Sequence, residues 1–96
     1  MAFLDIKITS QKKNSIIVDR QIDAGGIIIG KTNTAELGVG AHTANRLFGI
    51  TPNIYGNSQS SGGSSGGAGV AVAANLLPFA DGTDMMGSCR TPAAYA

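Results

Sequence analysis

The first third of the chain alternates between polar segments and short apolar blocks. After the polar residues 10–14, an apolar segment runs to the glycine pair Gly25-Gly26, and it carries Ile16, Ile17, Val18 and Ile22. Asn14 or Ser15 can cap a helix over this segment, which the glycines would end. Residues 27–29 are three isoleucines, a run typical of a buried strand. A helix, a glycine turn and a buried strand in this order predict an α/β layer.

The pattern is less regular on either side of this unit. Residues 1–9 alternate loosely between apolar and polar side chains, which predicts a short strand or an extended lead-in. Thr34 is placed to cap a short turn of helix over residues 35–37. Residues 38–56 contain few periodic apolar positions, so they predict an irregular connection, and long connections of this kind are often functional.

Small and apolar residues dominate the last third of the chain. Residues 67–77 predict a central helix, which Pro78 would stop because proline cannot continue a helix. A short apolar piece at 78–80 follows, with strand character, and then a polar turn. Residues 90–96 predict the start of another helix, with Pro92 in its first turn.

Composition and charge narrow the class of protein. Ninety-six residues are enough for one domain at most. A net charge of +1 with 14% charged residues gives no basic surface for nucleic acid or for an anionic membrane. The single cysteine, Cys89, excludes an internal disulfide and indicates a reducing, cytoplasmic compartment. The weakly polar run 68–80 is too short to span a bilayer, and the N-terminus lacks the apolar run of a signal peptide.

Two glycine- and serine-rich motifs suggest a chemical site. Gly62–Gly67 reads G-G-S-S-G-G, and Gly82–Ala93 reads G-T-D-M-M-G-S-C-R-T-P-A. Their serines Ser64 and Ser88 are 24 positions apart. A loop–helix–strand–turn unit of this length can bring its two ends together. We therefore expect one hydroxyl at a helix N-terminus, where free N–H groups are available, beside another in a glycine turn.

These motifs resemble those of the amidase signature family, hydrolases that cleave amides with a Ser–cis-Ser–Lys triad. The resemblance continues through G-K-T-N-T-A-E-L-G at 30–38 and N-R-L-F-G at 45–49, and it covers residues 17–95. It implies an α/β fold with a mixed central sheet flanked by helices. Enzymes of this family are several times longer, so the resemblance implies that residues 1–96 are a partial domain, with its motif core at 57–96.

The resemblance also implies a role for each residue of the two motifs. Ser88 would be the nucleophile, and Ser64, joined to Gly63 by a cis peptide, would be the bridging serine. Preorganised N–H donors stabilise the oxyanion in such sites, and here they would come from Met85, Met86, Gly87 and Ser88. Three further residues would support the site: Ser65, Asp84 and Arg90. The implied partner is a small-molecule amide, and no cofactor or metal is implied.

The sequence departs from the family pattern at two places. The family's base lysine precedes the bridging serine by more positions than this chain has. Lys31 belongs to the G-K-T-N motif and is expected to point away from the serines, while Lys7 lacks the family context. Without a neutral lysine to accept a proton, Ser64 cannot readily activate Ser88. Met86 replaces the usual glycine, which favours a general small-molecule amidase over the family member that forms glutaminyl-tRNA.

Other interpretations of the same residues are weaker. The segment Gly25–Thr32 fits the phosphate-binding pattern G-x-x-x-x-G-K-[ST], but its interior is Ile-Ile-Ile where a flexible loop is required. Residues 57–69 have the composition of a flexible linker, yet they lead directly into an apolar helix. His42 and Cys89 could each belong to a different nucleophilic site, but neither has a partner motif.

We therefore expect a fragment of an amidase that hydrolyses a carboxylic amide through a serine acyl-enzyme and is inactive alone. Its activity would require the remainder of the enzyme or self-association. Two alternatives stay open: a non-catalytic fragment of a truncated or split gene, and a nucleotide-binding module built on Gly25–Thr32. Neither a nucleic acid nor a membrane is expected as a partner.

Overall fold

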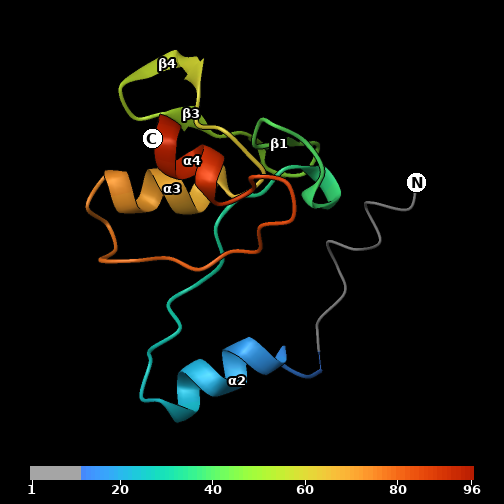
Figure 1. The fold of residues 1–96 in the computed structure, drawn as a ribbon, viewed down its shortest axis with the longest axis vertical. Helices are drawn as coiled ribbons and strands as arrows, with labels where there is room; N and C mark the ends of the chain where they lie inside the picture. The colour runs from blue at the N-terminus through green and yellow to red at the C-terminus, as the bar shows by residue number, and fades with distance from the viewer. Residues whose placement is uncertain (1–11) are drawn as a thin grey trace. The chain divides into compact units, whose positions relative to one another are not determined.

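The computed structural model describes residues 12–96 and divides into two units, residues 1–31 and residues 32–96 (Figure 1). The strand expected within residues 1–9 lies outside the described residues. None of the helices in residues 12–96 is both long and apolar enough to cross a membrane. In chain order the elements are α2 (Ile16–Asp23), the 3₁₀ turn η1 (Glu36–Gly38), β1 (Ala44–Asn45), β2 (Gly49–Ile50), β3 (Pro52–Asn53), β4 (Gly56–Ser60), α3 (Gly66–Ala73) and α4 (Arg90–Tyr95).

The described part of the first unit contains the predicted helix, α2. Ser15 is its N-cap residue, although its hydroxyl makes no capping hydrogen bond, and Asn14 instead donates to the Asp19 carboxylate at 2.9 Å. The helix ends as the glycine pair predicted. Gly25 adopts a positive φ of 87°, and the Gly26 N–H donates back to the Gln21 carbonyl at 2.8 Å. This closing turn satisfies carbonyls at the end of the helix.

The predicted strand at Ile27–Ile29 is wrong for the structure described. Residues 26–34 form neither helix nor strand, and the three isoleucine side chains are 88%, 47% and 70% exposed. A strand needs a neighbour to accept and donate its backbone hydrogen bonds. No segment within residues 12–96 pairs with these isoleucines, so their strand propensity has no sheet to join.

The second unit contains two small hairpins where an irregular connection was predicted. Strands β1 and β2 pair antiparallel, as do β3 and β4, in two separate two-stranded sheets. An asparagine shapes each turn. The Asn45 carbonyl oxygen Oδ1 accepts from the N–H groups of Leu47 and Phe48, and Asn53 Oδ1 accepts from Tyr55. Asparagine favours such turns because its short side chain can replace a backbone acceptor.

Helix α3 ends four residues earlier than the sequence predicted. Its last residue is Ala73, and Asn75 adopts a left-handed φ of 56°. The N–H of Leu76 then donates to the Ala71 carbonyl at 3.0 Å, which closes the helix without Pro78. Residues 78–80, expected to be a short strand, are coil. Helix α4 forms as predicted and lies beside α3 (Figure 1).

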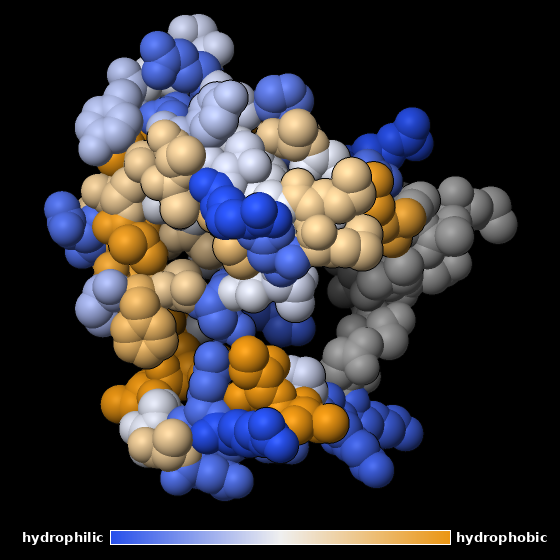
Figure 2. Space-filling model, in the orientation of Figure 1, coloured by the Kyte–Doolittle hydropathy of each residue, from blue (hydrophilic) through white to orange (hydrophobic). Residues whose placement is uncertain are grey.

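The described residues thus combine helices with small antiparallel sheets, which agrees with a mixed α and β composition. The mixed central sheet flanked by helices is not formed within residues 12–96. Many large apolar side chains are exposed instead, and Figure 2 shows them as orange patches on the surface. Exposed apolar surface of this extent marks a place where further protein can pack.

The core of the second unit is made of small and polar residues. Residues 61–66 are all buried, and Thr43, Ser61 and Pro92 are among the most buried side chains. Backbone lies directly against backbone here. A Cβ atom on Gly63 would lie 2.7 Å from the Gly40 carbonyl oxygen and 2.8 Å from the His42 nitrogen. Glycine at position 63 is therefore required by close packing.

We expect Gly63→Ala to lower the free energy of unfolding by about 1–3 kcal/mol, because the added methyl group overpacks a contact between two backbone segments. The matched control is Gly56→Ala, whose Cβ would meet only the Gln59 side chain, at 3.5 Å or more. The measurement is urea unfolding of the two variants and the unchanged chain. Equal midpoints for the two variants would contradict the close packing at Gly63.

Candidate active site

The glycine–serine loop at residues 61–66 is anchored on all sides, so the flexible-linker interpretation is wrong. Its Gly63–Ser64 peptide is cis, as the family resemblance implied. The Ser64 carbonyl accepts from the Ala35 N–H at 2.9 Å, and the Ser61 hydroxyl donates to the Thr51 carbonyl at 2.7 Å. The Ser64 side chain is 6% exposed. The loop therefore holds Ser64 in one place at the start of α3.

The two motifs meet through the backbone. The N–H of Ser65 donates to the carbonyl of Ser88 at 3.1 Å, which joins the start of α3 to the glycine turn. The 24-residue unit therefore does bring its two ends together, as the spacing predicted. Among the hydrogen bonds of residues 12–96, none links the hydroxyl of Ser64 to that of Ser88. The proton relay between the two hydroxyls stays a prediction.

Asp84 organises the turn that carries Ser88. One of its carboxylate oxygens accepts from the Gly87 N–H at 2.6 Å, and the other accepts from the N–H groups of Cys89 and Arg90, both at 3.1 Å. The Arg90 guanidinium closes the arrangement with two hydrogen bonds of 3.0 Å. Asp84 and Arg90 thus hold the turn in shape around the serine between them, and their supporting role in catalysis stays a prediction.

The environment of Asp84 favours its charged form. The hydrogen bonds from the Arg90 side chain, followed by the one from the Arg90 N–H, hold the Asp84 pKa well below its usual range. The N–H groups of Gly87 and Cys89 act in the same direction, and partial desolvation opposes them. A carboxylate with a lowered pKa in the folded state stabilises the fold above its unfolded pKa of about 4, and the stabilisation is lost as the pH falls below that value.

We expect Asp84→Asn to be less stable than the unchanged chain at pH 7, because a neutral amide cannot replace the charged acceptor. The deficit should shrink at pH 2.5, where the unfolded carboxylate is already protonated and the aspartate has lost part of its advantage. Urea midpoints at the two pH values measure this, with Asp81→Asn as control because Asp81 is exposed and makes no hydrogen bond within the described residues. A deficit of equal size at both pH values would contradict the assignment.

Of the four N–H groups expected to bind the oxyanion, one is hydrogen-bonded within the turn and three are not. The N–H of Gly87 is directed to Asp84 and is therefore not available to a substrate oxygen. The N–H groups of Met85, Met86 and Ser88 have no acceptor within residues 12–96. Gly87 has a φ of 100°, a conformation that favours glycine and makes the sharp bend before Ser88. The turn leaves three of the four predicted donors available.

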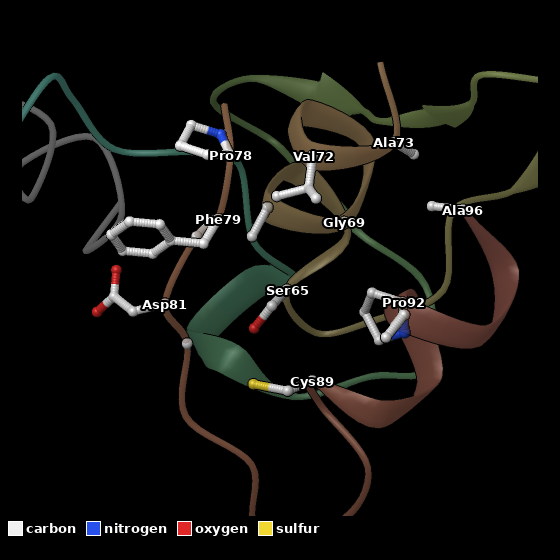
Figure 3. Close-up of a pocket in the computed structure, with 14 residues that line it drawn as sticks. Ser65, Gly69, Val72, Ala73, Pro78, Phe79, Asp81, Cys89, Pro92 and Ala96 are labelled. Atoms are coloured by element: carbon white, nitrogen blue, oxygen red, sulfur yellow. The ribbon is translucent and has the colours of Figure 1, made fainter. Parts of the chain in front are cut away.

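A pocket of about 430 Å³ adjoins the junction of the two motifs (Figure 3). Its walls come from α3, from α4 and from the coil 78–82, and most of them are apolar. Ser65 and Cys89 are the residues that follow the two motif serines, and both line it. Their hydroxyl and thiol lie close together, since a Cβ on Gly82 would be 2.9 Å from each of them. The pocket is large enough to accept a small apolar group.

No hydrogen bond within residues 12–96 joins a candidate base to the hydroxyl of Ser64 or Ser88. Lys31 is exposed and makes no hydrogen bond or ion pair within the same residues, and the expectation that it points away from the serines stays a prediction. Lys7 lies outside the described residues. His42 shares a 2.7 Å hydrogen bond with the Ser60 hydroxyl and has no carboxylate partner among the described interactions. No group of three or more His, Cys, Asp or Glu in this part of the chain could hold a metal ion.

The phosphate-binding pattern does not have its required context. A phosphate-binding loop lies between a strand and a helix whose N-terminus faces the anion. Here Gly25 ends a helix, Ile27–Ile29 form neither helix nor strand, and no helix starts at Lys31-Thr32. The geometry therefore gives no support to nucleotide binding at Gly25–Thr32.

Sequence reasoning passed over Thr43, and it included Asn33 and Asn45 only as members of the motifs at 30–38 and 45–49. Thr43 is buried beneath the glycine–serine loop, and Asn33 and Asn45 join their side chains at 2.6 Å beside it. The Asn33 backbone carbonyl also accepts from the Gly67 N–H at the start of α3. Thr43 gave no signal in the sequence, because its partners in the glycine–serine loop lie about 20 positions further along the chain.

Comparison with known proteins identifies the family. The family model described as "Amidase" matches residues 1–96. An acylamidase of Rhodococcus erythropolis is 52% identical over 81 residues, which cover 84% of this chain and 17% of that protein. A glutamyl-tRNA(Gln) amidotransferase subunit of Legionella pneumophila is 48% identical over 82 residues, which cover 85% of this chain and 17% of that protein.

The corresponding mitochondrial amidotransferase subunit of Pediculus humanus subsp. corporis is 41% identical over 96 residues, covering 88% of this chain and 19% of that protein. The chain thus spans less than a fifth of the length of these relatives. No solved structure matches the chain. Because the family model covers every residue and the two serine motifs meet in the fold, the chain belongs to the amidase family.

Proposed function

We propose that this chain supplies the nucleophile, the bridging serine and the oxyanion turn of an enzyme that hydrolyses carboxylic amides through a serine acyl-enzyme. The observation that carries the proposal is the hydrogen bond from the Ser65 N–H to the Ser88 carbonyl, which brings the two motifs together. Ser88 is the nucleophile, and Ser64 is the bridging residue. Residues 1–96 are then part of a larger amidase signature fold with a mixed central sheet.

The chemistry follows from the two hydroxyls. Ser88 Oγ forms a bond to the amide carbonyl carbon while its proton passes to Ser64 Oγ, and the Ser64 proton passes to a neutral lysine amine. The carbonyl electron pair moves onto oxygen, where the free N–H groups at 85, 86 and 88 stabilise it. Collapse of this intermediate breaks the C–N bond, and the amine leaves with the proton returned along the same path. Water then cleaves the acyl ester.

None of the lysines in this sequence stands in the motif that carries the family's base. We therefore propose that the base comes from a further part of the enzyme, and that this part also covers the exposed apolar side chains. The partner is the remainder of the enzyme, or a second copy of the chain. A fragment without any catalytic role is the alternative, and it predicts that Ser88 never becomes acylated in any context.

The names of the relatives give two classes of activity, that of an acylamidase and that of a glutamyl-tRNA(Gln) amidotransferase subunit. We propose the first for this chain. Met85 and Met86 are both 86% exposed and directly precede the turn that holds the nucleophile. Two apolar side chains at this place favour an apolar acyl group over a polar one such as that of glutamine.

The test is an acylamidase hybrid, which we define as the Rhodococcus erythropolis acylamidase with its 81 matched residues replaced by those of this chain. We expect the hybrid to hydrolyse an apolar aryl amide faster than glutamine, and a fluorophosphonate probe to label Ser88, as located by peptide mass spectrometry. A folded hybrid that is not labelled at Ser88 would support the non-catalytic alternative. Preference for glutamine would support the amidotransferase class.

A further inference from the structure

Thr43 makes three hydrogen bonds with one hydroxyl group beneath the glycine–serine loop. Its side chain is 1% exposed. Thr43 Oγ1 donates to the Gly62 carbonyl at 2.9 Å, with the Ser64 carbonyl at 3.3 Å as a second, longer acceptor, and it accepts from the Gly66 N–H at 2.7 Å. A hydroxyl has one proton and two lone pairs, so this one uses its proton, shared between two carbonyls, and one of its lone pairs. It links both ends of the loop that contains Ser64.

The segment that carries Thr43 also packs directly against the loop. Gly63 lies so close to the backbone of residues 40–42 that no Cβ fits between them. A Cβ on Gly66 would overlap the Thr43 side chain itself. The hydrogen-bonded hydroxyl and the backbone packing therefore act on the same five residues, 62–66, from the same side.

The loop's backbone is fixed, whereas the hydroxyl of its central serine is not. The Ser64 carbonyl is held by the Ala35 N–H at 2.9 Å and by Thr43. The Ser64 hydroxyl makes no hydrogen bond within residues 12–96. An arrangement that holds the backbone of a residue and leaves its side chain unbound is suited to positioning that side chain for a reacting partner.

We propose that Thr43 is a positioning residue for Ser64: its hydroxyl sets the orientation of the 62–66 backbone and thereby the direction in which the Ser64 hydroxyl points. The proposal rests on the proposed function, in which Ser64 passes the proton of Ser88. Valine has nearly the shape of threonine but no hydroxyl, whereas serine keeps the hydroxyl and loses only a methyl group. These two substitutions separate the hydrogen bonds from the packing.

The experiment is amide hydrogen exchange, followed by NMR, on the full chain and on its Thr43→Val and Thr43→Ser variants. We expect Thr43→Val to speed exchange about tenfold at the Gly66 N–H, which loses its acceptor, and also at the Ser65 N–H, which Thr43 does not touch. The amides of the β3–β4 hairpin should not change. Thr43→Ser should restore exchange at both Gly66 and Ser65.

Two results would overturn the proposal. One is unchanged exchange at Ser65 in Thr43→Val, and the other is a uniform change that includes the β3–β4 hairpin and means that Thr43 only supports the fold. If Thr43→Val does not fold, the test is made on the unchanged chain. The Gly66 N–H, which donates to Thr43, must then exchange more slowly than the Met86 N–H, which has no acceptor within residues 12–96. Equal exchange rates would refute the hydrogen bond between Gly66 and Thr43. None of these measurements requires activity, so an inactive hybrid would count against the proposed function alone.

Discussion

Replacing Ser88 with alanine in the acylamidase hybrid is expected to lower kcat for an aryl amide by about 10⁴- to 10⁶-fold. The methyl group of alanine cannot attack the carbonyl carbon, so no acyl-enzyme forms. The proposed oxyanion donors at 85, 86 and 88 are backbone groups and survive the substitution. Whatever rate remains should therefore measure substrate binding and oxyanion stabilisation without the nucleophile.

The matched control for this experiment is Cys89→Ala. Cys89 is the next residue, is partly buried, and carries a thiol, another nucleophilic group, at the junction of the two motifs. We expect its loss to change kcat by less than about tenfold, because it supports the pocket wall and does not react. The opposite result, in which Cys89→Ala abolishes turnover and Ser88→Ala preserves it, would show that the nucleophile is Cys89 and not Ser88.

The sequence correctly predicted those elements whose structure depends on residues a few positions apart. The helix over Ile16–Asp23 and its glycine end depend on contacts within a few positions, as does the first turn of α4 around Pro92. The meeting of the two serine motifs was predicted from their spacing. The cis peptide before Ser64 came from the family resemblance, and neither periodicity nor propensity would have indicated it.

The wrong predictions concern elements whose state depends on distant partners or on turn chemistry. Ile27–Ile29 have strand propensity, but a strand needs a neighbour, and none lies within residues 12–96. The end of α3 was placed at Pro78 because proline stops a helix, whereas Asn75 reaches a left-handed conformation first. The two hairpins were missed because their strands are only two to five residues long and their turns depend on asparagine side chains.

In the candidate site, too, residues within motifs could be predicted from the sequence and residues outside them could not. Ser64, Ser88, Asp84 and Arg90 belong to motifs, so their importance could be predicted without coordinates. Thr43 could not be found in this way, because it belongs to none of the motifs and acts on a loop that lies many positions further along the chain. The loss of Gly87 as an oxyanion donor also needed geometry. Only the structure shows that its N–H is directed to Asp84.

The 96-residue chain alone is expected to hydrolyse an aryl amide no faster than buffer, at least about 10⁴-fold more slowly than the acylamidase hybrid. A serine nucleophile needs a group that finally accepts its proton, and none of the lysines in this sequence stands in the motif that carries the family's base. The test is to purify the chain, establish by light scattering and circular dichroism whether it is monomeric and folded, and assay it beside the hybrid at equal concentration. Turnover above buffer that disappears in Ser88→Ala would show that the chain holds its own base.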